Sequence, residues 1–241
     1  MTREIRFFES LGAANRELAA NLAAILQTEA ATKGHATLVL TGGSTPQGLY
    51  QELAAAPLPW RQIHLFWGDE RFVPQDHPDS NYRMAKTTLL DRLELPPANI
   101  HPMVTGLDVT PTAAAARYEQ ALREFFGLRA TDSPLFPVFD CVLLGMGTDG
   151  HAASLFPGSP QLAERQRWTV ATAPAGTPSI PRITLTLPVL NHARRVIFLI
   201  SGPRKRQILD EIVGATATAM LHYPAARIDT PTQILWYVAH S

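Results

Sequence analysis

The stretch "ATLVLTGGSTPQGLYQELAAA", residues 36–56, contains in order a strand, a turn and a helix. Its apolar run is short and continuous, which is typical of a strand buried on both faces of a parallel sheet. Two glycines end the run, after which Ser44 or Thr45 can cap a helix and Pro46 suits its first turn. This order predicts one strand–helix unit of an α/β protein.

Strands and helices of the same kind alternate along the rest of the chain. Further strands are predicted at residues 63–70, 139–145, 167–173, 195–201 and 234–239, and helices at 11–32, 80–93, 111–127 and 203–213. This alternation predicts a three-layer α/β/α sandwich around a mostly parallel, Rossmann-like sheet. The best candidate for a domain boundary is the Pro-containing stretch 129–138. Because the alternation continues across it, we expect a single domain over residues 1–241.

The composition argues against several classes of protein. Lys plus Arg and Asp plus Glu both number 21, so no basic surface indicates nucleic acid. The single cysteine, Cys141, excludes a disulfide framework and is expected to be buried and inert. His77 and Asp79 lie in a polar loop, and no spaced set of His and Cys indicates a metal site.

The hydropathy pattern places no segment of the chain in a membrane. No apolar stretch reaches the ~20 residues that cross a bilayer, and the charged N-terminal stretch is unlike a signal peptide. We expect a cytoplasmic protein with no nucleic acid, no membrane and no obligate protein partner.

Three of the predicted strands end in unusual loops, and ligands of parallel sheets bind beyond such strand ends. In the first loop, "TGGST" (41–45), glycines allow a close backbone approach and the helix N-terminus offers free N–H groups. Gly42, Gly43, Ser44 and Thr45 are therefore candidates for a phosphate cradle. A tight turn with an ordinary helix cap explains this loop equally well.

The second loop, "GDER" (68–71), places three charged residues directly after an apolar strand. Asp69, Glu70 and Arg71 either line a ligand crevice or form a salt-bridged turn. A salt-bridged turn is the commoner explanation for one charged strand end. Because the neighbouring strand ends also carry residues suited to ligand binding, we favour the crevice.

The third loop lies in "LLGMGTDGHAASLFPG" (143–158), which has the glycine spacing of a dinucleotide fingerprint at Gly145, Gly147 and Gly150. Pro157 and Gly158 cut short the long helix that such a fingerprint needs, and no acidic residue occurs near residue 170. We therefore predict a glycine turn that directs Asp149 and His151 into the crevice. The alternative is that Asp149 caps a short helix and His151 packs in the core.

Cationic residues occur in two stretches downstream of these loops. Arg182 precedes a β-like run, and Arg204, Lys205 and Arg206 begin a predicted helix. The helix dipole disfavours cations at that end, so a bound anion would compensate the cost. A solvated basic turn is an adequate explanation for Arg204 and Arg206.

Together these segments closely resemble the 6-phosphogluconolactonases. The resemblance is carried by "LTGGSTPQGLY", "IHLFWGDERFVPQDHPDSNYRMAK", "FDCVLLGMGTDGHAASLFPGSP", "PRITLTLPVLNHARRVIFLISGPRKRQIL" and "YPAARI", which extend from residue 40 to residue 228. It implies hydrolysis of 6-phospho-D-glucono-1,5-lactone to 6-phosphogluconate in the pentose phosphate pathway, with no cofactor and no essential metal. It also implies the fold of glucosamine-6-phosphate deaminase and ribose-5-phosphate isomerase.

The resemblance assigns roles to the candidate catalytic residues. His151 would take a proton from the attacking water, because imidazole is a suitable base near neutral pH. Either Asp149 or Asp69 would orient it and stabilise the imidazolium.

Candidate substrate-binding residues follow in the same way. The phosphate would lie on the amides of residues 43–45, with Lys205 and Arg182 as counter-charges and Arg71 as a further contact. The chain departs from the family pattern at Arg206, where a small residue is usual, and in a C-terminus without the common acidic residue. Arg206 could alter phosphate recognition or oligomer contacts.

Two rival functions remain. Glucosamine-6-phosphate deaminases share the Asp-Gly-His element, but they resemble "DGHIAFNEP" where this chain has "DGHAASLFPG". Sugar-phosphate sensors of some transcription regulators share the fold and carry a helix-turn-helix before it. Here the first predicted strand begins at residue 36, and only one helix is expected before it.

Overall fold

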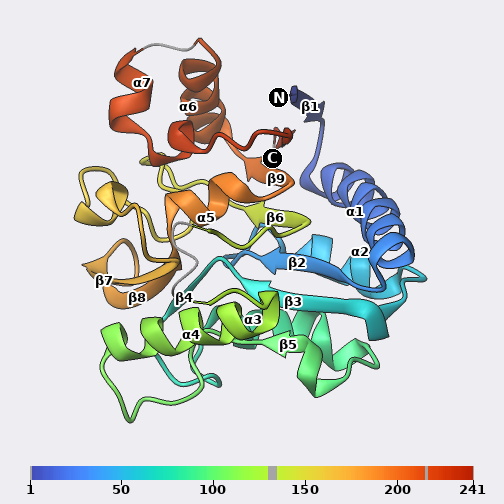
Figure 1. The fold of residues 1–241 in the computed structure, drawn as a ribbon. Coiled ribbons are helices and arrows are strands. Elements are labelled where there is room, and N and C mark those ends of the chain that lie inside the picture. The colour runs from blue at the N-terminus through green and yellow to red at the C-terminus, as the bar shows by residue number, and fades with distance from the viewer. Residues whose placement is uncertain (1, 130–134, 215–216, 241) are drawn as a thin grey trace.

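A computed structural model describes residues 2–129, 135–214 and 217–240, and in this part of the chain a seven-stranded parallel sheet forms the centre (Figure 1). Its strands run in the order β1-β10-β9-β6-β2-β3-β5, and every neighbouring pair is parallel. Their bounds are β1 Thr2–Phe8, β2 Ala36–Leu40, β3 Ile63–Trp67, β5 Ile100–His101, β6 Cys141–Leu144, β9 Arg195–Ser201 and β10 Gln233–Ala239.

Helices flank this sheet (Figure 1), so the predicted α/β class is confirmed. Their bounds are α1 Leu11–Lys33, α2 Gln47–Ala55, α3 Asn81–Thr88, α4 Pro111–Phe126, α5 Leu187–His192, α6 Pro203–Val213 and α7 Ala217–His222. Among the described residues no helix combines the length and the apolar character that a membrane crossing requires.

Local signals define several helix ends, although the helix predicted over 80–93 is divided into α3 and a short 3-10 turn at Leu90–Arg92. Ser80 caps α3 by accepting a bond from Arg83 N at 3.1 Å, and Thr110 caps α4 in the same way. Gly127 ends α4 in the left-handed conformation, with φ at 65°. Such a cap favours glycine because a Cβ is strained there.

A smaller antiparallel sheet, which the sequence did not predict, lies beside the central one. It consists of β4 Asp69–Arg71, β8 Ile180–Leu185 and β7 Thr169–Ala175, in the order β4-β8-β7. The single strand predicted over 63–70 is therefore wrong, because the chain leaves β3 at Gly68 and its next three residues pair with β8. Strand pairing between residues so distant in sequence leaves no local signal.

The N-terminus also differs from the prediction. The charged segment Thr2–Phe8 forms β1 at one edge of the central sheet, so the first strand begins well before residue 36. Charged side chains are common on edge strands, where they discourage further pairing. Part of the stretch 129–138 lies outside the described residues, and the single domain over residues 1–241 stays a prediction.

The core is built on both faces of the central sheet. All five residues of β2 are buried, and Phe198 stacks on Trp236 with ring centres 3.9 Å apart. Cys141 is buried as predicted, and burial raises the pKa of its thiol to about 12. A thiol with that pKa stays protonated and inert at neutral pH.

One buried carboxylate ties the start of β6 to its neighbours. Asp140 is fully buried and accepts bonds from Thr37 N at 2.9 Å and Thr37 Oγ1 at 3.0 Å. It also pairs with Lys33, at the end of α1, and with Arg194 at 3.5 Å. These contacts fix the end of the sheet that lies opposite its strand carboxyl ends.

We expect Asp140→Ala to lower the free energy of unfolding by about 1–3 kcal/mol, because the buried N–H of Thr37 loses its acceptor. The matched control is Asp229→Ala, whose carboxylate pairs with Arg3 at the surface. Exposed pairs contribute about 0–1 kcal/mol. Urea unfolding of both variants measures the difference, and equal losses would contradict a structural role for Asp140.

Candidate active site

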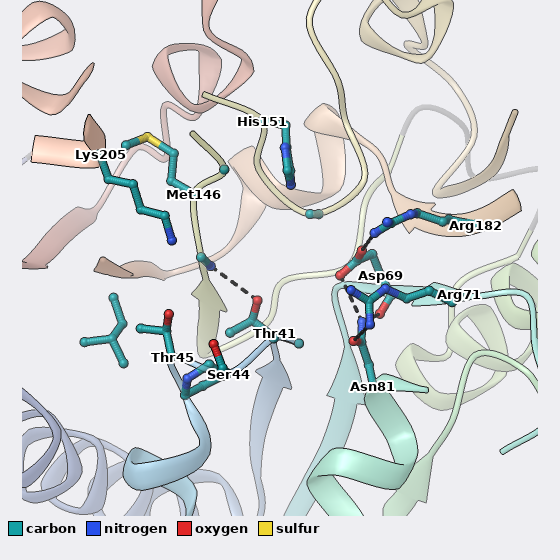
Figure 2. Close-up of a pocket in the computed structure, with 17 residues that line it drawn as sticks. Thr41, Ser44, Thr45, Asp69, Arg71, Asn81, Met146, His151, Arg182 and Lys205 are labelled. Atoms are coloured by element: carbon teal, nitrogen blue, oxygen red, sulfur yellow. Dashed lines mark hydrogen bonds and ion pairs between the residues drawn. The ribbon is translucent and has the colours of Figure 1, made fainter. Parts of the chain in front are cut away.

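The three predicted loops meet at one pocket, beyond the carboxyl ends of the central strands (Figure 2). The pocket encloses about 230 Å³ and is lined by residues of all three loops together with Arg182, Leu199 and Lys205. Three lining residues are cations and one, Asp69, is an anion, whereas the whole chain has no net charge. This excess of positive charge favours an anionic ligand.

The turn after β2 forms one wall of the pocket. Thr41 Oγ1 accepts a bond from Gly145 N at 3.2 Å, which ties this turn to the third loop. Ser44 and Thr45 line the pocket. The expectation that one of them caps α2 is wrong, since Pro46 occupies the cap position and no side-chain bond caps the helix. Figure 2 shows both side chains at the pocket.

The two glycines of this turn have different structural reasons. A Cβ on Gly42 would lie 1.9 Å from Oδ1 of Asn81, so the protein itself excludes a side chain there. At Gly43 φ is +90°, and no described atom lies within 4 Å of the position a Cβ would take. Gly43 is thus explained by its left-handed backbone, and not by a clash.

The third loop brings Asp149 and His151 into direct contact. Oδ1 of Asp149 lies 2.6 Å from Nδ1 of the imidazole and also accepts a bond from His151 N at 3.1 Å. The residues after Asp149 form turns and not a helix, which rules out the helix-cap alternative. Of the two aspartates considered, Asp149 is therefore the one that contacts the histidine.

Two further contacts orient the imidazole. Its ring packs against Phe156 with ring centres 4.5 Å apart. A Cβ on Gly147 would lie 2.2 Å from Nδ1 of His151, so the glycine provides the space for the ring.

Burial raises the pKa of Asp149, but the hydrogen bonds from His151 lower it, and the net pKa is below the ordinary value. Asp149 is therefore a carboxylate at neutral pH.

Asp69 lies on another wall and pairs with different groups. Its Oδ2 accepts a bond from Ser154 Oγ and lies 3.9 Å from Nη1 of Arg182. Both Asp69 and Arg182 are buried, and the guanidinium also lies over the ring of Phe156 at 5.5 Å. Figure 2 shows Arg182 beside Asp69, on the side of the pocket away from Lys205.

The other two charged residues of the second loop, Arg71 and Glu70, have different surroundings. Arg71 lines the pocket, and its Nη1 donates to Asp79 O at 2.7 Å and to Asn81 Oδ1 at 2.9 Å. Glu70, in β4, is buried against the start of α3, and burial raises its pKa to about 7. Asn81 also lines the pocket and was missed as a site residue, although "SNYRMAK" is part of the quoted resemblance.

Of the three cations at the start of α6, only Lys205 lines the pocket. Among the described residues none pairs with its ammonium group, and burial lowers its pKa. Arg204 is exposed and bonds to Gln207. The guanidinium of Arg206 lies 4.0 Å from the ring centre of Phe7 and pairs with Asp210, and it does not line this pocket.

No three His, Cys, Asp or Glu side chains are placed to hold a metal ion within the described ranges. His77 Nδ1 instead accepts a bond from Asp79 N at 3.1 Å. The pocket brings together an imidazole–carboxylate pair, two guanidinium groups, an ammonium group, the carboxylate of Asp69 and a glycine turn.

Comparison with known proteins agrees with this geometry. The family profile described as glucosamine-6-phosphate isomerases/6-phosphogluconolactonase matches residues 10–236. The chain belongs to this family. A family member from Synechocystis sp., a 6-phosphogluconolactonase, is 45% identical over 206 residues, which are 86% of this chain and 82% of that protein. A 6-phosphogluconolactonase from Nostoc sp. is 46% identical over 211 residues, or 88% and 85% of the two chains.

Solved structures of the family share the whole fold. The crystal structure of 6-phosphogluconolactonase from Thermotoga maritima superposes with a TM-score of 0.86 at 30% identity and covers 99% of this chain and 100% of that one. The 6-phosphogluconolactonase of Trypanosoma brucei superposes with a TM-score of 0.82 at 29% identity, covering 99% and 96%. The predicted resemblance is confirmed over nearly the whole chain.

Proposed function

We propose that the chain hydrolyses 6-phospho-D-glucono-1,5-lactone to 6-phospho-D-gluconate, the second step of the oxidative pentose phosphate pathway. The observation that carries the proposal is the contact of 2.6 Å between Asp149 and His151 at a pocket with excess positive charge. We further propose that it acts in the cytoplasm on a small sugar phosphate, with no nucleic acid, membrane or obligate protein partner.

In this proposal His151 is the general base. Its Nδ1 is bonded to Asp149, which leaves Nε2 to take a proton from the attacking water. Water adds to the lactone carbonyl carbon, and its proton passes to the imidazole. Collapse of the tetrahedral intermediate breaks the bond to the ring oxygen, which receives that proton from the imidazolium. Asp149 holds the ring and stabilises its positive charge during the cycle.

The carbonyl oxygen gains negative charge as water adds, and nearby donors lower that barrier. Arg71 and Arg182 supply positive charge on the wall that also holds Asp69. At the opposite wall, Lys205 lies on the same side as Thr45 (Figure 2). We assign the phosphate to Lys205 and the turn of residues 43–45, so Arg182 is placed at the other end of the ligand.

The decisive experiment compares three substrates with the purified protein. We expect rapid hydrolysis of 6-phosphogluconolactone, slow hydrolysis of gluconolactone without a phosphate, and no ammonia release from glucosamine 6-phosphate. Spontaneous lactone opening is subtracted in a blank without enzyme. Ammonia release would assign the chain to the deaminases of its family, and equal rates on both lactones would contradict the phosphate site.

We expect His151→Gln to lower kcat by about 10²-fold or more with little change in KM, because the base acts in the transition state. Steady-state kinetics of the wild type and the variant at neutral pH, with spontaneous lactone opening subtracted, measure both constants. At that pH the lowered pKa of Asp149 keeps the partner carboxylate charged.

Asp149→Asn provides the matched change to the partner. Without the neighbouring negative charge the imidazolium formed during the reaction is less stable, so we expect kcat to fall. A fully active His151→Gln protein would overturn the assignment of the base.

We expect Lys205→Ala to weaken 6-phosphogluconate binding by about 1.5–3 kcal/mol, the size of a hydrogen bond to a charged group. Arg204→Ala, on the adjacent exposed residue, should change it far less. Because burial lowers the pKa of Lys205, its charge is lost at a lower pH than in an exposed lysine, and wild-type affinity should fall on the alkaline side. Calorimetry measures the affinity of the two variants and the pH dependence of the wild-type affinity. Equal effects of the two substitutions would indicate only a diffuse basic patch.

A further inference from the structure

We propose that Asn81 is a positioning residue that sets Asp69 and Arg71 relative to the glycine turn at Gly42. Asn81 is the first residue of α3, is buried, and lines the pocket directly below Asp69 and Arg71 in the view of Figure 2. The proposal rests on the proposed function, in which the turn binds phosphate while the other wall faces the lactone.

Asn81 uses both ends of its amide on the charged wall. Its Nδ2 donates to Asp69 O at 2.9 Å and lies 3.4 Å from Asp69 Oδ1. Its Oδ1 accepts a bond from Arg71 Nη1 at 2.9 Å. One side chain therefore holds both the backbone carbonyl of Asp69 and the guanidinium of Arg71, the two residues on either side of Glu70.

The same amide group fills the space beside Gly42. The three atoms nearest to a Cβ built on Gly42 all belong to Asn81: Oδ1 at 1.9 Å, Cγ at 2.2 Å and Nδ2 at 2.6 Å. The turn after β2 and the strand β4 therefore meet through this side chain. A shift of the turn would therefore displace β4, and a shift of β4 would displace the turn, because a close-packed interior leaves no free space between them.

Glu70 prevents Asn81 from moving away. Its Oε1 accepts bonds from Asn81 N at 2.8 Å and Arg71 N at 2.7 Å. Its Oε2 accepts bonds from Tyr82 N at 2.7 Å and Ser80 Oγ at 3.1 Å. The backbone at the start of α3 is thus fixed by a buried carboxylate, while the side-chain amide of Asn81 is held by Asp69 and Arg71.

The test is a cycle of single and double substitutions. We expect Gly42→Ala to lower kcat/KM for 6-phosphogluconolactone by about 10²-fold or more and Asn81→Ala by about 10-fold or more, since ~0.5 Å of misplacement already weakens such sites. In the Asn81→Ala background the added methyl group meets no amide, so Gly42→Ala should cost at least 10-fold less than in the wild type. Costs that simply multiply would overturn the proposal.

A purely structural role would give a different pattern. The matched control is Asn99→Ala, because Asn99 is also buried and donates to two backbone carbonyls, Arg61 O and Ile63 O, away from the pocket. We expect both alanine variants to have a lower Tm than the wild type. Only Asn81→Ala should lower kcat and reduce the ratio of kcat/KM for the phosphorylated lactone to kcat/KM for gluconolactone. Calorimetry with inorganic phosphate should show binding to Asn81→Ala within about 3-fold of the wild type, since the turn itself is intact.

The two proposals fail in different ways. An inactive wild type would contradict the proposed lactonase function. An active wild type whose Asn81→Ala variant keeps its kcat and its preference for the phosphorylated lactone would contradict the positioning role alone.

Discussion

The geometry of the pocket depends on a junction at Gly68, where the polypeptide leaves the central sheet. The N–H of Gly68 donates to Leu40 O at the end of β2, and its carbonyl accepts a bond from Leu185 N at the end of β8, both at 2.9 Å. These two bonds direct the next three residues into β4 and bring the small sheet against the large one. Without them, Asp69 would continue along β3 and could not face the same cavity as Arg182.

The junction also places like charges close together. Arg71 lies opposite Arg182 in the pairing of β4 with β8. Such a pair is unfavourable unless anions or bound ligands compensate it, because burial makes unpaired charge costly. Asp69 lies 3.9 Å from Arg182, and the amide of Asn81 accepts a bond from Arg71. The compensation within the protein is partial, which leaves this wall able to stabilise negative charge on a ligand.

The imidazole–carboxylate pair has a simpler origin. Asp149 and His151 are two residues apart, and the turn between them contains Gly150 with φ at +80°. Gly147 N donates to His151 O at 2.9 Å, which closes the turn. The contact is therefore local and needs little from the rest of the molecule except the end of β6. For this reason the motif could be identified from the sequence, and the same holds for helix ends such as Gly127.

The sequence by itself determined the α/β class, the boundaries of helices such as 203–213, and the three loops whose residues line the pocket. These features depend on hydrophobic period and on short-range capping, which are written in neighbouring residues. Only the tertiary structure decided that β4 belongs to a second sheet, that Asp149 and not Asp69 contacts His151, and that Lys205 alone of three adjacent cations lines the pocket. Only the tertiary structure showed why residue 42 is glycine. The second sheet, the position of Lys205 and the close packing at Gly42 depend on partners tens of residues away, and Asp69 pairs with Ser154 and Arg182, which are equally distant, instead of with His151. Residue order does not encode the distance between such groups until the chain is packed.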